Sequence, residues 1–403
     1  MSKSLQDRVL NLISTPELVD LTSRLVAAGG ENPGGTEEGT VAVLQASCRD
    51  AGLETSTAAV APGRPNFTAV LPGGNSPGFL FLGHSDVVPA GAGWEHPPFD
   101  PIVRAGRLYG RGSTDMKGGL AAVVIALKAL KEAHVQLPGD VALACTVDEE
   151  DLGLGIRAFT ASASAGTYDA CVVAEPTDLT VVIGCRGDSY LELTVTGRSA
   201  HSGRPADGRN AIDAAAGILL LIRADQEQLQ RTQDPLLGAG SWNTGLIHGG
   251  TGTSMVAAEC ALSIDRRLMP DEDAGMILTQ LMERIEGSGL TGDGISVRGG
   301  IAMEMPGFRT PVDHPLVRGA VAAVREGCAG AEPDESNPDP VVGGWSAACD
   351  GGFIARDLGV PTIVLGPGGL NDQAHQINES VRIADLAVAA RAYALMILRH
   401  GFS

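Results

Sequence analysis

Residues 79–89 read FLFLGHSDVVP, an apolar run that ends at His84 and is followed two residues later by Asp86. Another acidic residue, Asp115, lies in the segment GRGSTDMKG of residues 110–118, after a second short apolar run. Short apolar runs indicate buried strands, and in open α/β sheets the functional side chains gather at the carboxyl ends of strands. A histidine and an aspartate in these positions predict half of a metal site.

Three further segments supply the other half of this site. Each places acidic or imidazole groups after an apolar run: Asp148-Glu149-Glu150 after residues 141–147, Glu175 after residues 170–174, and His375 after residues 362–365. The adjacent acids 148–151 fit a solvated loop, but side-by-side carboxylates repel, and a bound dication removes that cost. Asp115 also fits a helix cap, because a helical apolar pattern follows it. Imidazole and carboxylate donors suit Zn²⁺, and two such ions about 3.5–4 Å apart are a common device for hydrolysis.

The length and texture of the chain predict two domains. With 403 residues it is too long for one ordinary core. Helical periodicity alternates with short apolar strands up to about Gly184, as in a layered α/β domain. From about Asp188 a period-two strand pattern, a helix near residues 210–230 and two more strands predict a small sheet with helices on one face. We expect the change of domain near residues 187–188.

Taken in order, the five segments make the chain similar to the metallopeptidase family that includes acetylornithine deacetylase, succinyl-diaminopimelate desuccinylase, aminoacylase and the glutamate-releasing carboxypeptidases. The resemblance covers nearly the whole chain. It implies an α/β catalytic domain with a mixed, largely parallel sheet and helices on both faces. It also implies that residues 188–300 are an inserted α+β lid of ferredoxin-like type, and that the catalytic domain comprises residues 1–187 and 301–403.

The resemblance further implies a set of metal ligands. His84 and Glu175 would hold one zinc ion, Glu150 and His375 would hold the other, and Asp115 would bridge the pair. Each subunit would therefore carry two Zn²⁺ ions. Co²⁺ or Mn²⁺ can replace zinc with such donors.

Other residues receive catalytic roles from the same resemblance. Glu149 would be the general base, and Asp86 would orient the His84 imidazole. The lid segment of residues 197–205 contains His201, which by itself reads as a surface residue. In the family this histidine reaches the active site, often that of the partner subunit, and polarises the scissile carbonyl. The resemblance thus implies a homodimer formed through the lid.

The resemblance gives less specific indications for substrate contacts. Arg266 matches the lid arginine that binds the substrate carboxylate, although a surface ion pair would explain it equally well. Gly366 and Gly368 supply a turn whose N–H groups fit an anion, or simply a tight turn. The chain has Ser254 and Ala257 where relatives have a lid asparagine and proline. These departures bear on substrate contacts and leave the metal ligands unchanged.

Composition excludes several classes of protein. The net charge is −19, and no basic stripe is present to neutralise phosphates, which argues against nucleic acid as a partner. No apolar run reaches the roughly 18–20 residues that cross a bilayer, and residues 1–20 do not resemble a secretory signal. The seven cysteines include no CxxC pair, which suits reduced thiols. We expect a cytoplasmic enzyme.

The function that these residues predict is metal-dependent amide hydrolysis. The expected substrates are small N-acyl amino acids, cleaved into a carboxylic acid and a free amino acid. A dipeptidase or carboxypeptidase of the same family is the main alternative. A metal-containing binding protein without turnover is a third hypothesis, against which Glu149 argues, because a general base has no obvious use in a binder.

Overall fold

The computed structural model describes residues 3–329 and 341–400, and the chain divides into two compact units. Unit 1 comprises Met1–Gly184, Arg309–Gly343 and Phe353–Ser403, and unit 2 comprises Cys185–Phe308 and Gly344–Gly352. The later border differs from the expected one at residue 300. Strand β12 (Ser296–Met305) pairs with β9 (Gly187–Thr196) of unit 2, so residues 301–305 belong to the insert and not to the catalytic domain.

Unit 1 is built on a mixed sheet with the strand order β1-β2-β6-β3-β7-β15-β8-β13, and β14 also pairs with β8. The four central strands β6, β3, β7 and β15 run parallel, whereas β1, β2 and β8 are antiparallel to their neighbours. The strands span Glu54–Ala61 (β1), Arg64–Leu71 (β2), Ser76–His84 (β3), Gly139–Thr146 (β6), Tyr168–Val173 (β7), Val181–Cys185 (β8), Phe308–Arg309 (β13), Val342–Trp345 (β14) and Thr362–Val364 (β15). A small second sheet contains Ile102–Arg104 (β4), Arg107–Tyr109 (β5) and Ser380–Arg382 (β16).

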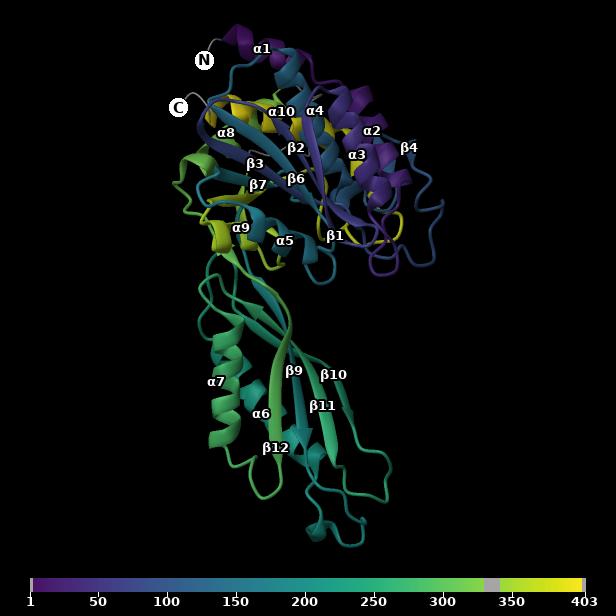
Figure 1. Ribbon diagram of the computed structural model, residues 1–403, viewed down its shortest axis with the longest axis vertical. Helices are drawn as coiled ribbons and strands as arrows, with labels where there is room; N and C mark the ends of the chain where they lie inside the picture. Colours follow the sequence, from purple (N-terminus) through teal and green to yellow (C-terminus); the bar gives the residue numbers. More distant parts are fainter. Residues whose placement is uncertain (1–2, 330–340, 401–403) are drawn as a thin grey trace. The chain divides into compact units, whose positions relative to one another are not determined.

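Helices lie on both sides of the main sheet, with α4, α8 and α10 above the labelled strands in Figure 1 and α5 and α9 below them. They span Lys3–Asn11 (α1), Thr15–Ala27 (α2), Glu38–Asp50 (α3), Gly118–Glu132 (α4), Leu154–Ser162 (α5), Pro315–Cys328 (α8), Gly351–Leu358 (α9) and Ile383–His400 (α10). Helix α4 lies in the interior of unit 1, since every residue from Gly118 to Leu127 is buried. Among the described residues, no helix combines the length and apolar composition that crossing a bilayer requires.

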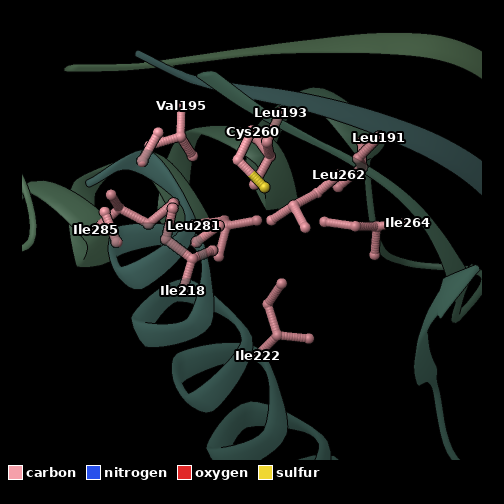
Figure 2. Packing of buried hydrophobic residues seen from close by; sticks show 13 residues of the cluster. Leu191, Leu193, Val195, Ile218, Ile222, Cys260, Leu262, Ile264, Leu281 and Ile285 are labelled. Carbon is pink, nitrogen blue, oxygen red and sulfur yellow. The ribbon is translucent and has the colours of Figure 1, made fainter. Parts of the chain in front are cut away.

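Unit 2 has the chain order β9-α6-β10-β11-α7-β12 and the sheet order β10-β11-β9-β12, which is the ferredoxin-like arrangement. Its elements span Gly187–Thr196 (β9), Ala211–Leu229 (α6), Ser241–Gly249 (β10), Glu259–Leu268 (β11), Ala274–Gly287 (α7) and Ser296–Met305 (β12). Alternate residues of β9 and β11 face the helices, and Figure 2 shows this packing. Leu193 and Leu262 from the sheet contact the layer that contains Ile218 of α6 and Leu281 of α7. Asn210 and Asp273 cap the two helices through their side chains, which fixes where each helix begins.

Candidate metal centre

The predicted metal ligands of unit 1 come from strand ends that the parallel sheet brings together. His84 is the last residue of β3, Glu150 follows β6, and Glu175 follows β7. Because β6, β3 and β7 are adjacent and parallel, their carboxyl ends meet at one edge of the sheet. Asp115 lies in the turn Ser113–Lys117 just before α4, and His375 lies in the loop after β15.

Two groups of candidate ligands form at this edge, and they share Asp115. In the first group, His84 Nε2 lies 3.2 Å from Asp115 Oδ1 and 3.3 Å from Glu175 Oε1. In the second group, His375 Nε2 lies 3.3 Å from Asp115 Oδ2 and 3.2 Å from Glu150 Oε2. Within each group the ligand atoms all lie within 4.8 Å of one another. The structure therefore brings all five expected ligands into one cluster.

The chemistry of this donor set fits a cation. His84 Nδ1 lies 3.0 Å from the backbone carbonyl oxygen of Asp86. A carbonyl oxygen only accepts hydrogen bonds, so in the neutral ring the proton is on Nδ1, and the Nε2 lone pair faces the Asp115 and Glu175 carboxylates. In addition, Glu150 Oε1 is buried without a hydrogen-bond partner. Lone pairs and carboxylate oxygens that converge in a buried place are stabilised by a metal ion.

Electrostatics indicate the same need for positive charge. Burial, together with the negative charge of Asp115, raises the pKa of Glu175 to about 8. Hydrogen bonds to Asp115 and Glu150 raise the pKa of His375 to about 10. Burial alone would raise the pKa of Asp115, but the two imidazoles lower it below its ordinary value. With protein groups alone, protons must partly neutralise the cluster, which a dication does better.

Asp86 contacts different atoms from those expected. Its carboxylate Oδ1 lies 3.6 Å from His84 Nδ1, so the closer contact to the ring comes from the Asp86 backbone carbonyl. The carboxylate instead accepts the backbone N–H groups of Glu149 at 3.3 Å and Glu150 at 3.1 Å. Asp86 therefore holds both a ligand histidine and the loop with the expected base, the first through its backbone and the second through its side chain.

A second buried carboxylate, Glu379, supports the site and was not singled out from the sequence. It accepts the backbone N–H groups of Gly112 (3.0 Å), Thr114 (2.8 Å) and Asp115 (3.0 Å), and Nη1 of Arg111 donates to it at 2.7 Å. Arg111 also donates to the backbone carbonyl of Gln376, beside His375. Glu379 thus fixes the loop of Asp115. No local pattern marks it, because Arg111 is 268 residues away in the chain.

Comparison with known proteins identifies the family. The model of the peptidase family M20/M25/M40 matches residues 80–399. The chain belongs to this family. It is 34% identical over 338 residues to a succinyl-diaminopimelate desuccinylase of Nitrosomonas europaea, covering 81% of this chain and 84% of the relative. It is 30% identical over 375 residues to an acetylornithine deacetylase of Edwardsiella ictaluri, covering 91% of each.

Solved structures agree on the fold of this M20/M25/M40 peptidase. An aminopeptidase of Bacillus cereus aligns with a TM-score of 0.76 at 22% identity and covers 96% of this chain and 98% of that chain. At this level of identity the likeness concerns the fold, which has the layered catalytic domain and inserted lid expected from the sequence.

His201, in unit 2 of this M20/M25/M40 peptidase, is an exposed residue after β9 that forms an isolated β-bridge with Met255. Its Nδ1 accepts the backbone N–H of Gly203 at 3.0 Å. This bond places the proton of the neutral ring on Nε2, which is then a donor. The imidazole therefore has the tautomer that an oxyanion contact requires.

Arg266 lies in a different environment from the one expected for a substrate contact. Its side chain is 1% exposed, its Nη2 lies 2.6 Å from Glu272 Oε1, and its guanidinium lies over the ring of Trp242. Alternate residues of β11 are buried, so the neighbouring Arg267 lies on the opposite face, where its side chain is 30% exposed. There Arg267 contacts Asp188 at 3.2 Å and Asp265 at 3.1 Å. Adjacent arginines in a strand point to opposite faces, which the sequence comparison alone did not resolve.

The loop that contains Gly366 and Gly368 serves packing at both glycines. The Gly366 N–H donates to Thr177 Oγ1 at 3.2 Å, and a side chain at Gly366 would meet the backbone oxygen of Glu175 at 2.4 Å. Gly368 has φ of +81°, and its carbonyl accepts the N–H of Asp178 at 2.7 Å. Because the Gly366 amide already has a partner, the tight-turn interpretation describes it better than an anion site.

Proposed function

We propose that this chain is a metal-dependent hydrolase that cleaves the amide bond of N-acyl amino acids. The observation that carries this proposal is the pair of candidate ligand groups that share Asp115 and lie beside Glu149. Relatives named as a desuccinylase and a deacetylase support this class of substrate.

The proposed ligands are those of the two groups. His84 and Glu175 would hold one ion, Glu150 and His375 the other, and Asp115 both. We propose Zn²⁺ at each position, with Co²⁺ or Mn²⁺ as substitutes, because imidazole and carboxylate donors suit all three. When bound, such ions make water more acidic and polarise a carbonyl oxygen.

Glu149 is the proposed general base. It takes a proton from the attacking water and passes it to the nitrogen of the leaving amine. Its backbone N–H is held by the Asp86 carboxylate, which limits how far the residue can move from its neighbour Glu150.

Two residues of unit 2 have proposed roles in substrate contacts. The Nε2–H of His201 donates to the oxyanion that develops during attack. We assign the substrate carboxylate to Arg267 and not to Arg266, because the Arg267 side chain is 30% exposed whereas that of Arg266 is 1% exposed. Arg267 would exchange its contacts with Asp188 and Asp265 for the substrate. A guanidinium binds a carboxylate through two parallel N–H groups.

We also propose a homodimer that forms through unit 2. Strand β10 is an edge of its sheet, and Leu246 and Ile247 on it are 55% and 49% exposed. An exposed edge strand with apolar side chains is a ready site for pairing with a second copy. A cytoplasmic location is proposed because Cys48, Cys145, Cys171, Cys185 and Cys260 are buried thiols outside any disulfide.

A panel of substrates tests the proposed function. The purified protein is assayed with N-acetyl, N-succinyl and N-formyl amino acids and with dipeptides, before and after chelation, alongside measurement of its metal content. Release of free amino acid from an N-acyl substrate that stops on chelation supports the proposal. Faster cleavage of dipeptides would favour a peptidase instead, and bound metal without any hydrolysis would favour a binding protein.

A further inference from the structure

Asp148, the residue before Glu149, is a buried carboxylate that holds the loop after β6. One of its oxygens, Oδ2, accepts the backbone N–H groups of Leu152 at 3.3 Å and Leu154 at 3.2 Å, so it closes the loop on itself. Its other oxygen, Oδ1, accepts from Arg64 Nη1 at 2.7 Å and from Asn32 Nδ2 at 3.0 Å. Asp148 therefore ties the loop to two residues from an earlier part of the chain.

Asn32 connects this carboxylate to Asp86. Its side-chain nitrogen donates to Asp148 Oδ1 and also to Asp86 Oδ2, at 2.9 Å. An amide NH₂ has two hydrogens, so both bonds form at once. Asp86 also accepts the N–H groups of Glu149 and Glu150. The loop is therefore fixed at Asp148 by its side chain and at the next two residues by their backbone.

Arg64 supplies the positive charge of this buried network. Its Nε and Nη2 contact both oxygens of Glu37, while Nη1 contacts Asp148. The side chains of Glu37 and Asp148 are each 1% exposed, and that of Arg64 is 17% exposed. Two buried carboxylates without a cation would repel each other and lose hydration. Arg64 is the basic partner of both.

We propose that Arg64, acting through Asp148, is a positioning residue for the loop that presents Glu149 and Glu150. The inference rests on the proposed function, because it concerns how well that loop serves as base and ligand. The described side-chain contacts of Arg64 are with Glu37 and Asp148, and neither of these is a candidate ligand. Loss of Arg64 is therefore expected to weaken binding of the ion at Glu150 and His375. Binding of the ion at His84 and Glu175 should change less.

The test is a double-mutant cycle with Arg64→Met, Asp148→Asn and the double variant. Zn²⁺ binding to chelator-treated protein is measured by calorimetry, and kcat, KM and Tm are measured on the zinc-loaded enzymes. We expect each single variant to lower the affinity for one of the two zinc ions by about tenfold or more. We also expect kcat to fall with little change in KM. If both residues act through their mutual contact, the double variant should lose no more than the worse single one.

Two control variants separate positioning from general stability. Arg24→Met removes an exposed arginine paired with Asp20, and it should leave zinc binding and kcat unchanged. Arg64→Lys keeps the charge but not the planar fork, so it should recover only part of the loss. If Arg64→Met does not fold, the cycle is run with Arg64→Lys in its place.

The outcomes distinguish this inference from the proposed function. If the wild-type protein binds no zinc and hydrolyses no amide, the proposed function fails. If the wild-type protein binds two ions and turns over, but the variants match it, the positioning role alone is wrong. Equal weakening of both ions with additive losses in the double variant would also overturn it, because that pattern is general destabilisation.

Discussion

The Oδ2 of Asp115 lies 3.3 Å from Nε2 of His375. The other oxygen of the same carboxylate lies 3.2 Å from Nε2 of His84, which comes from a different strand end. One carboxylate with a histidine at each oxygen is the arrangement expected of a bridge between two ions. The backbone N–H of Asp115 donates to Glu379, so protein contacts alone orient this carboxylate.

Replacement of Asp115 with alanine should release both ions together. The residue belongs to both candidate groups, so neither group keeps its full set of donors. Metal content per subunit, measured after dialysis against metal-free buffer, checks this. Asp20→Ala, at an exposed position, is the matched control. One tight ion at normal occupancy in the Asp115 variant would contradict the bridging role.

Replacement of Glu149 with glutamine should abolish turnover while both ions stay bound. The amide keeps the size of the side chain but cannot take a proton, and loss of a general base lowers kcat by on the order of a thousandfold. Steady-state kinetics and metal analysis on one preparation check both parts, with Glu132→Gln at a more exposed helix position as control. Loss of metal from Glu149→Gln would show instead that Glu149 is a ligand.

Much of the fold is readable from local patterns. The apolar runs before His84 and Glu175 are short, and a parallel sheet then brings their ends together. The alternation in β9 similarly indicates a sheet with one buried face. The sequence does not mark the end of the insert at residue 305, because two consecutive glycines in the middle of β12, Gly299 and Gly300, weaken its strand pattern.

The sequence predicts less of the candidate site than of the fold. The ligand residues follow strands and are visible as polar groups after apolar runs. Arg64 and Glu379 cannot be recognised in this way. Asp148 is 84 residues from Arg64 and Arg111 is 268 residues from Glu379, so no local sequence pattern links either residue to its partner. The sequence also does not show which of the adjacent residues Arg266 and Arg267 is buried. Both are arginines, and the alternation of side chains along β11 places Arg266 on the buried face.

The metal-free protein should lose stability as pH rises. The folded-state pKa of Glu175 is about 8 and that of His375 about 10, both above their ordinary values. The native state therefore holds more protons than the unfolded state between about pH 4.5 and 10, and the free energy of unfolding falls as pH rises through that window. Metal binding needs deprotonated ligands and grows stronger in the same direction.

The difference in Tm between zinc-loaded and chelated protein should accordingly widen with pH. Thermal denaturation at several pH values between about 5.5 and 8.5 measures it. A difference that stays constant or narrows would contradict the assigned charges of the cluster.

Replacement of Arg266 should affect stability, whereas replacement of Arg267 should affect substrate binding. Arg266→Met removes the partner of Glu272 and should lower the free energy of unfolding by about 3 kcal/mol. Arg267→Met should instead raise KM for substrates with a free carboxylate by about tenfold or more, with a smaller change in kcat. Denaturant titration and kinetics on both variants check this. A KM effect confined to Arg266→Met would restore the original assignment to Arg266.

His201 should matter for chemistry far more than for folding. His201 is exposed, and the hydrogen bond that its ring accepts, from the Gly203 N–H to Nδ1, is local, so His201→Ala should leave Tm and metal content nearly unchanged. If Nε2–H donates to the oxyanion, kcat should fall by on the order of a hundredfold, because that donor acts mainly in the transition state. His96→Ala, at an exposed position of unit 1 with no assigned role, is the control. A rise in KM alone would mean that His201 contributes only ground-state binding, and wild-type kinetics would remove the lid histidine from the mechanism.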